Sequence, residues 1–237
     1  MVDYESQFEK PEYGLTRQTA VARTFKLVYG WMFAGLAVSG AVAWYAATSR
    51  PLMRAVFAVP NFYILIGLEL ALVFGLSAGI RKIPAALAVV LFMGYSALNG
   101  LTLSAIFHVY DLGSIVRVFF ISAGMFGGLA VYGTVTKSDL SGVGSFCGMA
   151  LWGLILAIVV NMFAGSSGLD LVISFAGIVI FTGLTMYDAQ KVRQMAAEEG
   201  SIDSATVQKL GIIGALALYL DFINIFLYLL KLFGKER

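Results

Sequence analysis

Residues 211–233, GIIGALALYLDFINIFLYLLKLF, decide the fold class, because an apolar run of this length is typical of a helix inside a bilayer. Asp221 stands in the middle of the run. A charged side chain at that depth costs roughly 2.5–3.5 kcal/mol on insertion scales. The carboxyl must therefore be neutral, paired or next to water, which makes Asp221 a candidate functional residue.

The composition of the whole chain also indicates a membrane protein. Of its 237 residues, 59% are hydrophobic and 13% are charged, whereas a soluble domain carries about 25% charged residues. The net charge of +2 gives no reason to expect a nucleic-acid partner. A single cysteine, Cys147, excludes a disulfide framework and suits a buried apolar position.

Seven segments are long and apolar enough to span a bilayer. They are residues 27–48, 61–79, 84–107, 113–135, 143–165, 169–188 and 211–233. The connections are short, and the longest polar one covers 191–209. The sequence therefore predicts an all-α integral membrane protein with one seven-helix domain over 27–237. A polar arm, 1–26, precedes it and lacks the features of a cleaved signal peptide.

The lysines and arginines predict the orientation, since cytoplasmic loops of membrane proteins carry an excess of them. Ten of the 16 lie on the side of the N-terminus and six on the other, three of them in the C-terminal tail. We expect a cytoplasmic N-terminus and, after seven spans, a C-terminus outside. The basic tail works against this orientation.

The glycines give two further expectations. Gly75-xxx-Gly79, Gly124-xxx-Gly128 and Gly144-xxx-Gly148 have the spacing that lets helices pack closely. The third and sixth spans share a short echo, GLTLSA from Gly100 and GLTMYD from Gly183. Spans three apart run in opposite directions, as an inverted repeat requires, and the seventh span would then be a central element.

The remaining polar groups in the spans leave alternatives open. Glu69, in the middle of the second span, is either protonated, paired or lining a wet cavity. Asn99 and Asn224, taken alone, suit hydrogen bonds between helices. Asp188 lies at the end of the sixth span and reaches Asp221 only if that helix continues past it or if water enters. The following sequence, AQKVRQMAAEE, forms helices well and permits the continuation.

Two motifs carry a resemblance to a known family. The final span with LYLDFIN from Leu218, the sequence GLTMYDAQKV from Gly183 and the short basic turn at Arg81 resemble the Bax-inhibitor-one family, and its bacterial members in particular. The resemblance covers the chain from the first span onward. It implies two three-helix layers around a central C-terminal helix, in the bacterial inner membrane.

The resemblance also implies a function, a pH-sensitive calcium-leak channel. Its sensor would be a hydrogen-bonded aspartate pair that matches Asp188 and Asp221. Arg81 is the nearest match to a basic residue after the second span that contacts the pair in some members, and Glu69 matches an acidic position in the second span. The resemblance makes both candidates for the gate or the ion path. Two carboxyls that share a hydrogen bond titrate as a coupled pair. They would form a weak calcium site, with backbone carbonyls, Asn224 or water as further oxygen ligands. Calcium ions and protons are then the partners inside the bilayer, and no cofactor is expected.

Other classes of function have less support. The chain has no HExxH, GxSxG or Walker motif and one histidine, His108, so we expect no enzyme. One alternative is a regulatory protein that binds a membrane partner, such as a membrane protease, through the arm and the 191–209 segment. Another is a proton-coupled transporter that uses the same acids. Ion selectivity and the direction of pH gating stay open.

Overall fold

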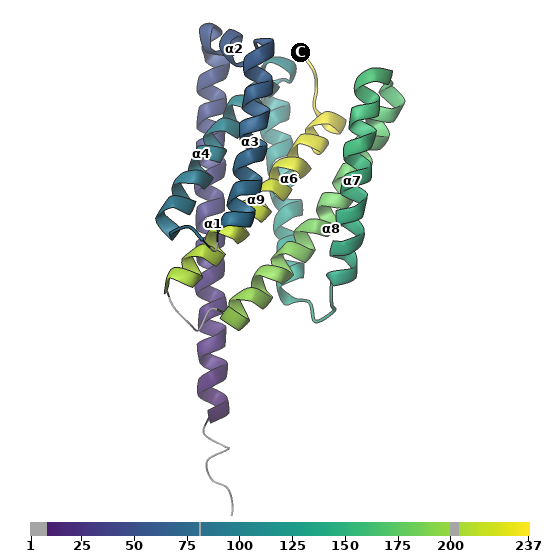
Figure 1. Cartoon of the computed structure of the whole chain (residues 1–237). Helices are drawn as coiled ribbons and strands as arrows, with labels where there is room; N and C mark the ends of the chain where they lie inside the picture. Colours follow the sequence, from purple (N-terminus) through teal and green to yellow (C-terminus); the bar gives the residue numbers. More distant parts are fainter. Residues whose placement is uncertain (1–8, 81, 200–203) are drawn as a thin grey trace, which may run out of the picture.

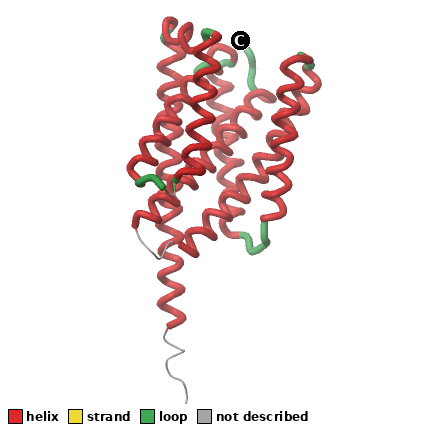
Figure 2. Tube along the Cα trace, viewed as in Figure 1, coloured by secondary structure: helices red, strands yellow, loops and turns green. Residues whose placement is uncertain are grey.

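The computed structural model describes residues 9–80, 82–199 and 204–237, and nearly all of them are helical. The helices are α1 (Glu9–Thr48), α2 (Arg50–Val56), α3 (Val59–Gly79), α4 (Ala85–Leu103), α5 (Ile106–Val109), α6 (Leu112–Val135), α7 (Ser141–Ala164), α8 (Ser167–Glu199) and α9 (Ser204–Phe233) (Figure 1). Figure 2 shows how short the loops between them are. Seven segments of these helices are long and apolar enough to cross a membrane, which confirms the predicted fold class.

Proline, glycine and aspartate mark the helix boundaries. Pro60 stands in the first turn of α3, and Pro84 is the residue before α4, where a missing N–H does least harm. Gly165 ends α7 with a φ of 59°, a left-handed conformation that glycine adopts without steric cost. Asp111 caps α6, because its carboxylate accepts a hydrogen bond from the backbone N–H of Ser114.

Three helices extend beyond the segments predicted as spans. Helix α8 continues eleven residues past Asp188 to Glu199, and α9 begins at Ser204, seven residues before the predicted start at 211. The segment 191–209, expected as a polar loop, is therefore mostly helix. Helix α1 begins at Glu9 and enters the first span without a break. Polarity set the predicted limits, but a helix does not have to end where it leaves the apolar phase.

Helix α9 is the most buried of the seven. In its apolar 18-residue stretch 72% of the residues are buried, compared with 11–39% in the corresponding stretches of the other spans. It packs against α1, α4, α6 and α8, and Figure 1 shows it crossing between the other helices. This position agrees with the expected central C-terminal helix. Contacts also join α1 to α4 and α4 to α3, and they join α8 to α6 and α7. Two layers of three helices stay a prediction.

Most of the predicted glycine motifs do not pack against other helices. A Cβ atom added at Gly75, Gly79, Gly124 or Gly128 would meet nothing within 4 Å. Of the six motif glycines only Gly144 lies at a close contact, against the ring of Tyr187. The prediction from spacing is therefore wrong for the first two motifs. Spacing alone does not say which face of a helix turns toward a neighbour, and these faces point away from the bundle.

Candidate functional site

Asp221 lies in the interior of the bundle, on the central helix. The residue is 3% exposed to solvent, and its Oδ2 atom has no hydrogen-bond partner among the described residues. Buried polar atoms in proteins are nearly always hydrogen-bonded, and an exception needs an explanation. The unpartnered oxygen makes this carboxyl the strongest candidate for a functional group in the described part of the chain.

Asp188 lies beside Asp221, across the contact between α8 and α9. The structure brings the two carboxyls close enough for their charges to interact. The positive charge of Lys191, one turn further along α8, interacts with Asp188. The continuation of α8 past residue 188 makes this approach possible, as the helix-forming sequence allowed. The two acids therefore interact through their charges, while the direct hydrogen bond that the family resemblance implies stays a prediction.

Two neighbours of the pair were not predicted from the sequence. The hydroxyl of Thr185 interacts with the Asp221 carboxyl, and it also donates a hydrogen bond of 2.7 Å to the carbonyl of Phe181. The thiol of Cys147 on α7 lies near enough to Asp221 to interact electrostatically with its carboxyl group. Thr185 was visible in the GLTMYD motif three residues before Asp188, a spacing that places both on one helix face. Cys147 carried no such signal.

Glu69 takes part in a second polar cluster, between α3 and α4. The hydroxyl of Thr102 donates a hydrogen bond of 2.6 Å to Glu69 Oε1, and the side chain of Asn99 also interacts with this carboxyl. Glu69 is half-buried. Among the three alternatives from the sequence, the geometry favours a carboxyl paired with polar neighbours.

The Glu69 cluster continues to the central helix through Asn99. The Tyr219 hydroxyl donates a hydrogen bond of 2.9 Å to Asn99 Oδ1 and lies 2.7 Å from Ser39 Oγ. Ser39 Oγ in turn lies 2.7 Å from the carbonyl oxygen of Ser96. This row of polar groups, which joins α1, α9, α4 and α3, is called the Tyr219 network below. The sequence analysis identified Asn99 and Glu69 but not Ser39, Thr102 or Tyr219.

The two halves of the sequence echo have similar local surroundings. Gly100 and Gly183 both lie at close helix contacts, Gly100 against the backbone of Ser39 and Gly183 against the thiol of Cys147. Two residues later, Thr102 and Thr185 each lie beside a carboxyl of another helix. The echo therefore marks two similar acid-binding corners, one for Glu69 and one for Asp221.

Two predicted site residues remain, Asn224 and Arg81. The Asn224 amide donates a hydrogen bond of 2.8 Å to the carbonyl of Leu220 in its own helix. Arg81 lies outside the described residues. Within the described ranges no three histidine, cysteine, aspartate or glutamate side chains gather as a metal site would require. Calcium takes six to eight oxygen ligands, so the pair would need water or carbonyl oxygens to hold one.

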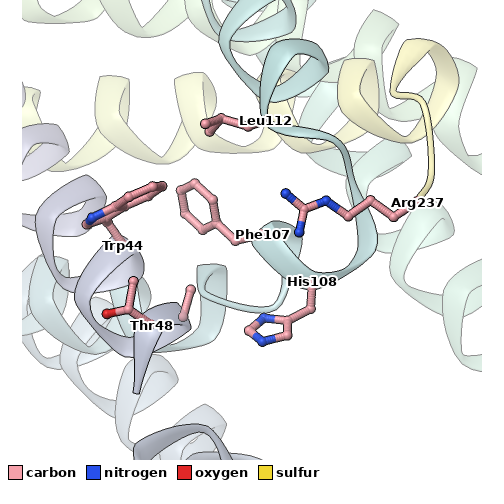
Figure 3. A pocket seen from close by; sticks show the side chains of 7 residues that line it. Trp44, Thr48, Phe107, His108, Leu112 and Arg237 are labelled. Carbon is pink, nitrogen blue, oxygen red and sulfur yellow. The ribbon is translucent and has the colours of Figure 1, made fainter. Parts of the chain in front are cut away.

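A separate cavity lies at the end of the bundle where α1 ends. Its volume is about 200 Å³, and it is lined by Trp44, Ala47, Thr48, Phe107, His108, Leu112 and Arg237 (Figure 3). The C-terminal tail runs past it, with the Arg237 N–H donating to the carbonyl of Val109 at 3.0 Å. Figure 3 shows the Arg237 side chain reaching toward Phe107 and His108. None of the candidate acids lines this cavity.

Comparison with known proteins places the chain among bacterial membrane proteins. The profile of a family described as "Inhibitor of apoptosis-promoting Bax1" matches residues 21–237. The "Inner membrane protein YbhL" of Escherichia coli (strain K12) is 48% identical over 231 residues, which cover 96% of this chain and 95% of that protein. A protein of Deinococcus radiodurans is 45% identical over 220 residues, 93% of this chain and 91% of its own. The similarity thus extends over nearly the whole length of these relatives.

Proposed function

The chain belongs to the family of inhibitors of apoptosis-promoting Bax1, and on this premise we propose that it is a pH-sensitive calcium-leak channel in which Asp188 and Asp221 are the sensor. The family and the seven apolar helices identify it as a multi-pass inner membrane protein. We propose transport rather than catalysis.

One observation carries the proposal, namely the carboxyl of Asp221. It sits on the most buried helix with one oxygen lacking a hydrogen-bond partner among the described residues, and a second acid stands beside it. Two buried neighbouring carboxyls cannot both ionise cheaply. A shared proton would satisfy the unpartnered oxygen and hold α8 against α9.

Loss of that proton supplies the switch in this proposal. Two negative charges then repel each other across the α8–α9 contact, and their oxygens become ligands for a cation. The pair offers few ligands, and a site with few ligands suits weak binding and passage. Glu69 provides a further anionic oxygen elsewhere in the bundle, at the Thr102 corner. We assign it to the ion path.

We further propose that the N-terminus is cytoplasmic. The start of α1 and the C-terminus lie at opposite ends of the bundle (Figure 1), and ten of the 16 basic residues lie on the N-terminal side. In the tail, Lys231 forms an ion pair with Asp170, so part of its positive charge is neutralised. Ion pairing of the tail reduces the conflict between its basic residues and an outside location.

A second candidate function is regulation of a membrane partner. Helix α1 begins at Glu9 and projects beyond the bundle at the N-terminal side (Figure 1). Together with the end of α8, it offers a surface on the proposed cytoplasmic side. If this surface carries the function, shortening α1 from its N-terminus impairs the protein, whereas neutral replacement of Asp188 and Asp221 does not.

Calcium flux in liposomes tests the proposed function. Purified protein is reconstituted with an internal calcium indicator, and the flux is measured over a pH series against protein-free liposomes. We expect protein-dependent calcium entry that changes with pH. Flux equal to that of protein-free liposomes at every pH would refute the channel.

A further inference from the structure

The central helix carries polar groups on two opposite faces. Asp221 turns toward α8, whereas Tyr219 belongs to the network with α1 and α4. Two residues along an α-helix correspond to a rotation of about 200°. Any rotation of α9 that moves the Asp221 carboxyl must therefore also move the Tyr219 hydroxyl.

Tyr219 is held tightly on its side of the helix. Its side chain is 0% exposed. The hydroxyl lies 2.7 Å from Ser39 Oγ on α1 and 2.9 Å from Asn99 Oδ1 on α4. The rings of Phe92 and Tyr95 meet the Tyr219 ring edge to face, each with a centroid distance of 5.8 Å. Displacement of this side chain would break two hydrogen bonds and two ring contacts.

The partners of Tyr219 are themselves fixed. Ser39 Oγ lies 2.9 Å from the carbonyl oxygen of Gly35 as well as 2.7 Å from that of Ser96. Gly100 lets α4 approach α1 at this point, since a Cβ atom there would be 2.7 Å from the Ser39 carbonyl oxygen. Close backbone approach and buried hydrogen bonds hold α1 and α4 firmly together at this point, so the contact restrains the position of Tyr219 on α9.

We propose that Tyr219 is a positioning residue for Asp221: its hydroxyl, held by α1 and α4, fixes the rotation of α9 so that the Asp221 carboxyl faces Asp188. This inference rests on the proposed sensor role of the pair. It adds to that role a residue on the opposite face of the helix, in contact with neither acid by any interaction that the described residues show.

In the described part of the chain, few ionisable groups surround the two faces. Asp188 on α8 and Cys147 on α7 face Asp221, and Lys191 acts on Asp188. On the other face, Tyr95 and Glu69 interact with Tyr219. Replacing Tyr219 by phenylalanine leaves all of these groups in place, so a changed response of Asp221 would report a change in its position.

The test compares two matched tyrosines of α9. Tyr219→Phe removes the hydroxyl from the network. Tyr228→Phe removes a hydroxyl for which the described residues show no hydrogen bond. The aromatic ring at position 228, which stacks on Phe181, is retained. Ser39→Ala removes the partner on α1 and leaves Tyr219 intact. It also serves as the test variant if Tyr219→Phe fails to fold.

Two readouts separate this inference from the proposed function. The first is the pH midpoint of calcium flux in liposomes. The second is infrared titration of the carboxyl stretch that disappears in Asp221→Asn, which requires no transport. A hydrogen bond contributes about 0.5–1.5 kcal/mol net, so its loss can shift the midpoint by at most roughly 0.4–1.1 pH units. We expect Tyr219→Phe and Ser39→Ala to shift both midpoints, and to shift the infrared midpoint toward that of Asp188→Asn.

The control result decides between positioning and mere stabilisation. We expect Tyr228→Phe to leave the infrared midpoint of Asp221 unchanged. If Tyr219→Phe and Ser39→Ala lower the melting temperature but keep this midpoint, or if Tyr228→Phe shifts it equally, the positioning role is wrong. If the infrared midpoint shifts as expected while the wild-type protein shows no calcium flux, the positioning role stands and the channel proposal fails.

Discussion

At the scale of single residues, the protein keeps a buried carboxyl oxygen without a partner in the described structure. Leaving such a group unsatisfied costs free energy, typically about 1–3 kcal/mol or more for a charged group. Stability alone therefore gives no reason for an aspartate at position 221. An asparagine has nearly the same size and supplies both a donor and an acceptor.

We accordingly predict that Asp221→Asn folds normally. Its melting temperature in detergent should equal that of the wild-type protein or exceed it by a few degrees, because no charge remains to be buried. Thermal unfolding and size-exclusion chromatography measure this, with the exposed Glu236→Gln as a matched control. Aggregation of Asp221→Asn alone would mean that the acid is needed for folding.

Glu69→Gln should change the amount of calcium flux more than its pH dependence. Glutamine keeps an acceptor oxygen for the Thr102 hydroxyl, so the Tyr219 network stays intact. It removes the negative charge that we assign to the ion path. Flux measured at saturating and low calcium over the same pH series checks this. A shift of the pH midpoint without a change in maximal flux would assign Glu69 to the sensor instead.

At the scale of helices, close approach of α7 and α8 supports the aspartate pair. Gly183 on α8 lies against Cys147 and Val143 of α7, so that a Cβ atom there would overlap the Cys147 sulfur. The same helix carries Thr185 two residues and Asp188 five residues after Gly183. Pushing α8 away from α7 would therefore disturb the geometry of the pair as well as the packing.

Gly183→Ala should destabilise the protein by about 1–3 kcal/mol, the usual cost of overpacking a tight core. The matched control is Gly148→Ala on α7, where an added Cβ atom would meet nothing within 4 Å. Alanine also favours helix over glycine, so the control should be neutral or slightly stabilised. Denaturation of both variants in the same detergent compares them. Equal stability of the two would contradict the close contact.

At the scale of the whole molecule, the sequence predicts the number of spans but not all of their limits. Hydropathy counts apolar residues, and the described residues contain seven helices long and apolar enough to cross a membrane. It could not predict that α8 reaches Glu199, because the helical extension is polar. The glycine spacing predicted close packing at Gly75 and Gly124, where the structure shows open space.

The candidate site was predictable in part. Asp221 stood out because an acid in an apolar stretch is costly, and the family resemblance paired it with Asp188. The Tyr219 network was not predictable, since serine, threonine and tyrosine are common in spans and their partners come from distant segments. Ser39 and Tyr219 are 180 residues apart in the sequence. Only the packing of α1, α4 and α9 brings them together.

The topology gives a prediction for the whole chain. Single cysteines added at the N-terminus and after Arg237, in a Cys147→Ala background, should react with an impermeant thiol reagent from opposite sides of the membrane. We expect the N-terminal site to be protected in spheroplasts and the C-terminal site to be labelled, because the basic residues favour a cytoplasmic N-terminus. Labelling of both sites in intact spheroplasts would overturn the orientation.

The central claim, that the aspartate pair gates calcium by pH, is tested most directly by liposome calcium flux over a pH series with Asp188→Asn and Asp221→Asn. A coupled pair loses its shared proton when either member is replaced. Both variants should therefore flatten the pH response seen in the wild-type protein, whereas the exposed control Glu236→Gln should retain it. An unchanged pH profile in both asparagine variants would contradict the sensor role and favour regulation of a membrane partner.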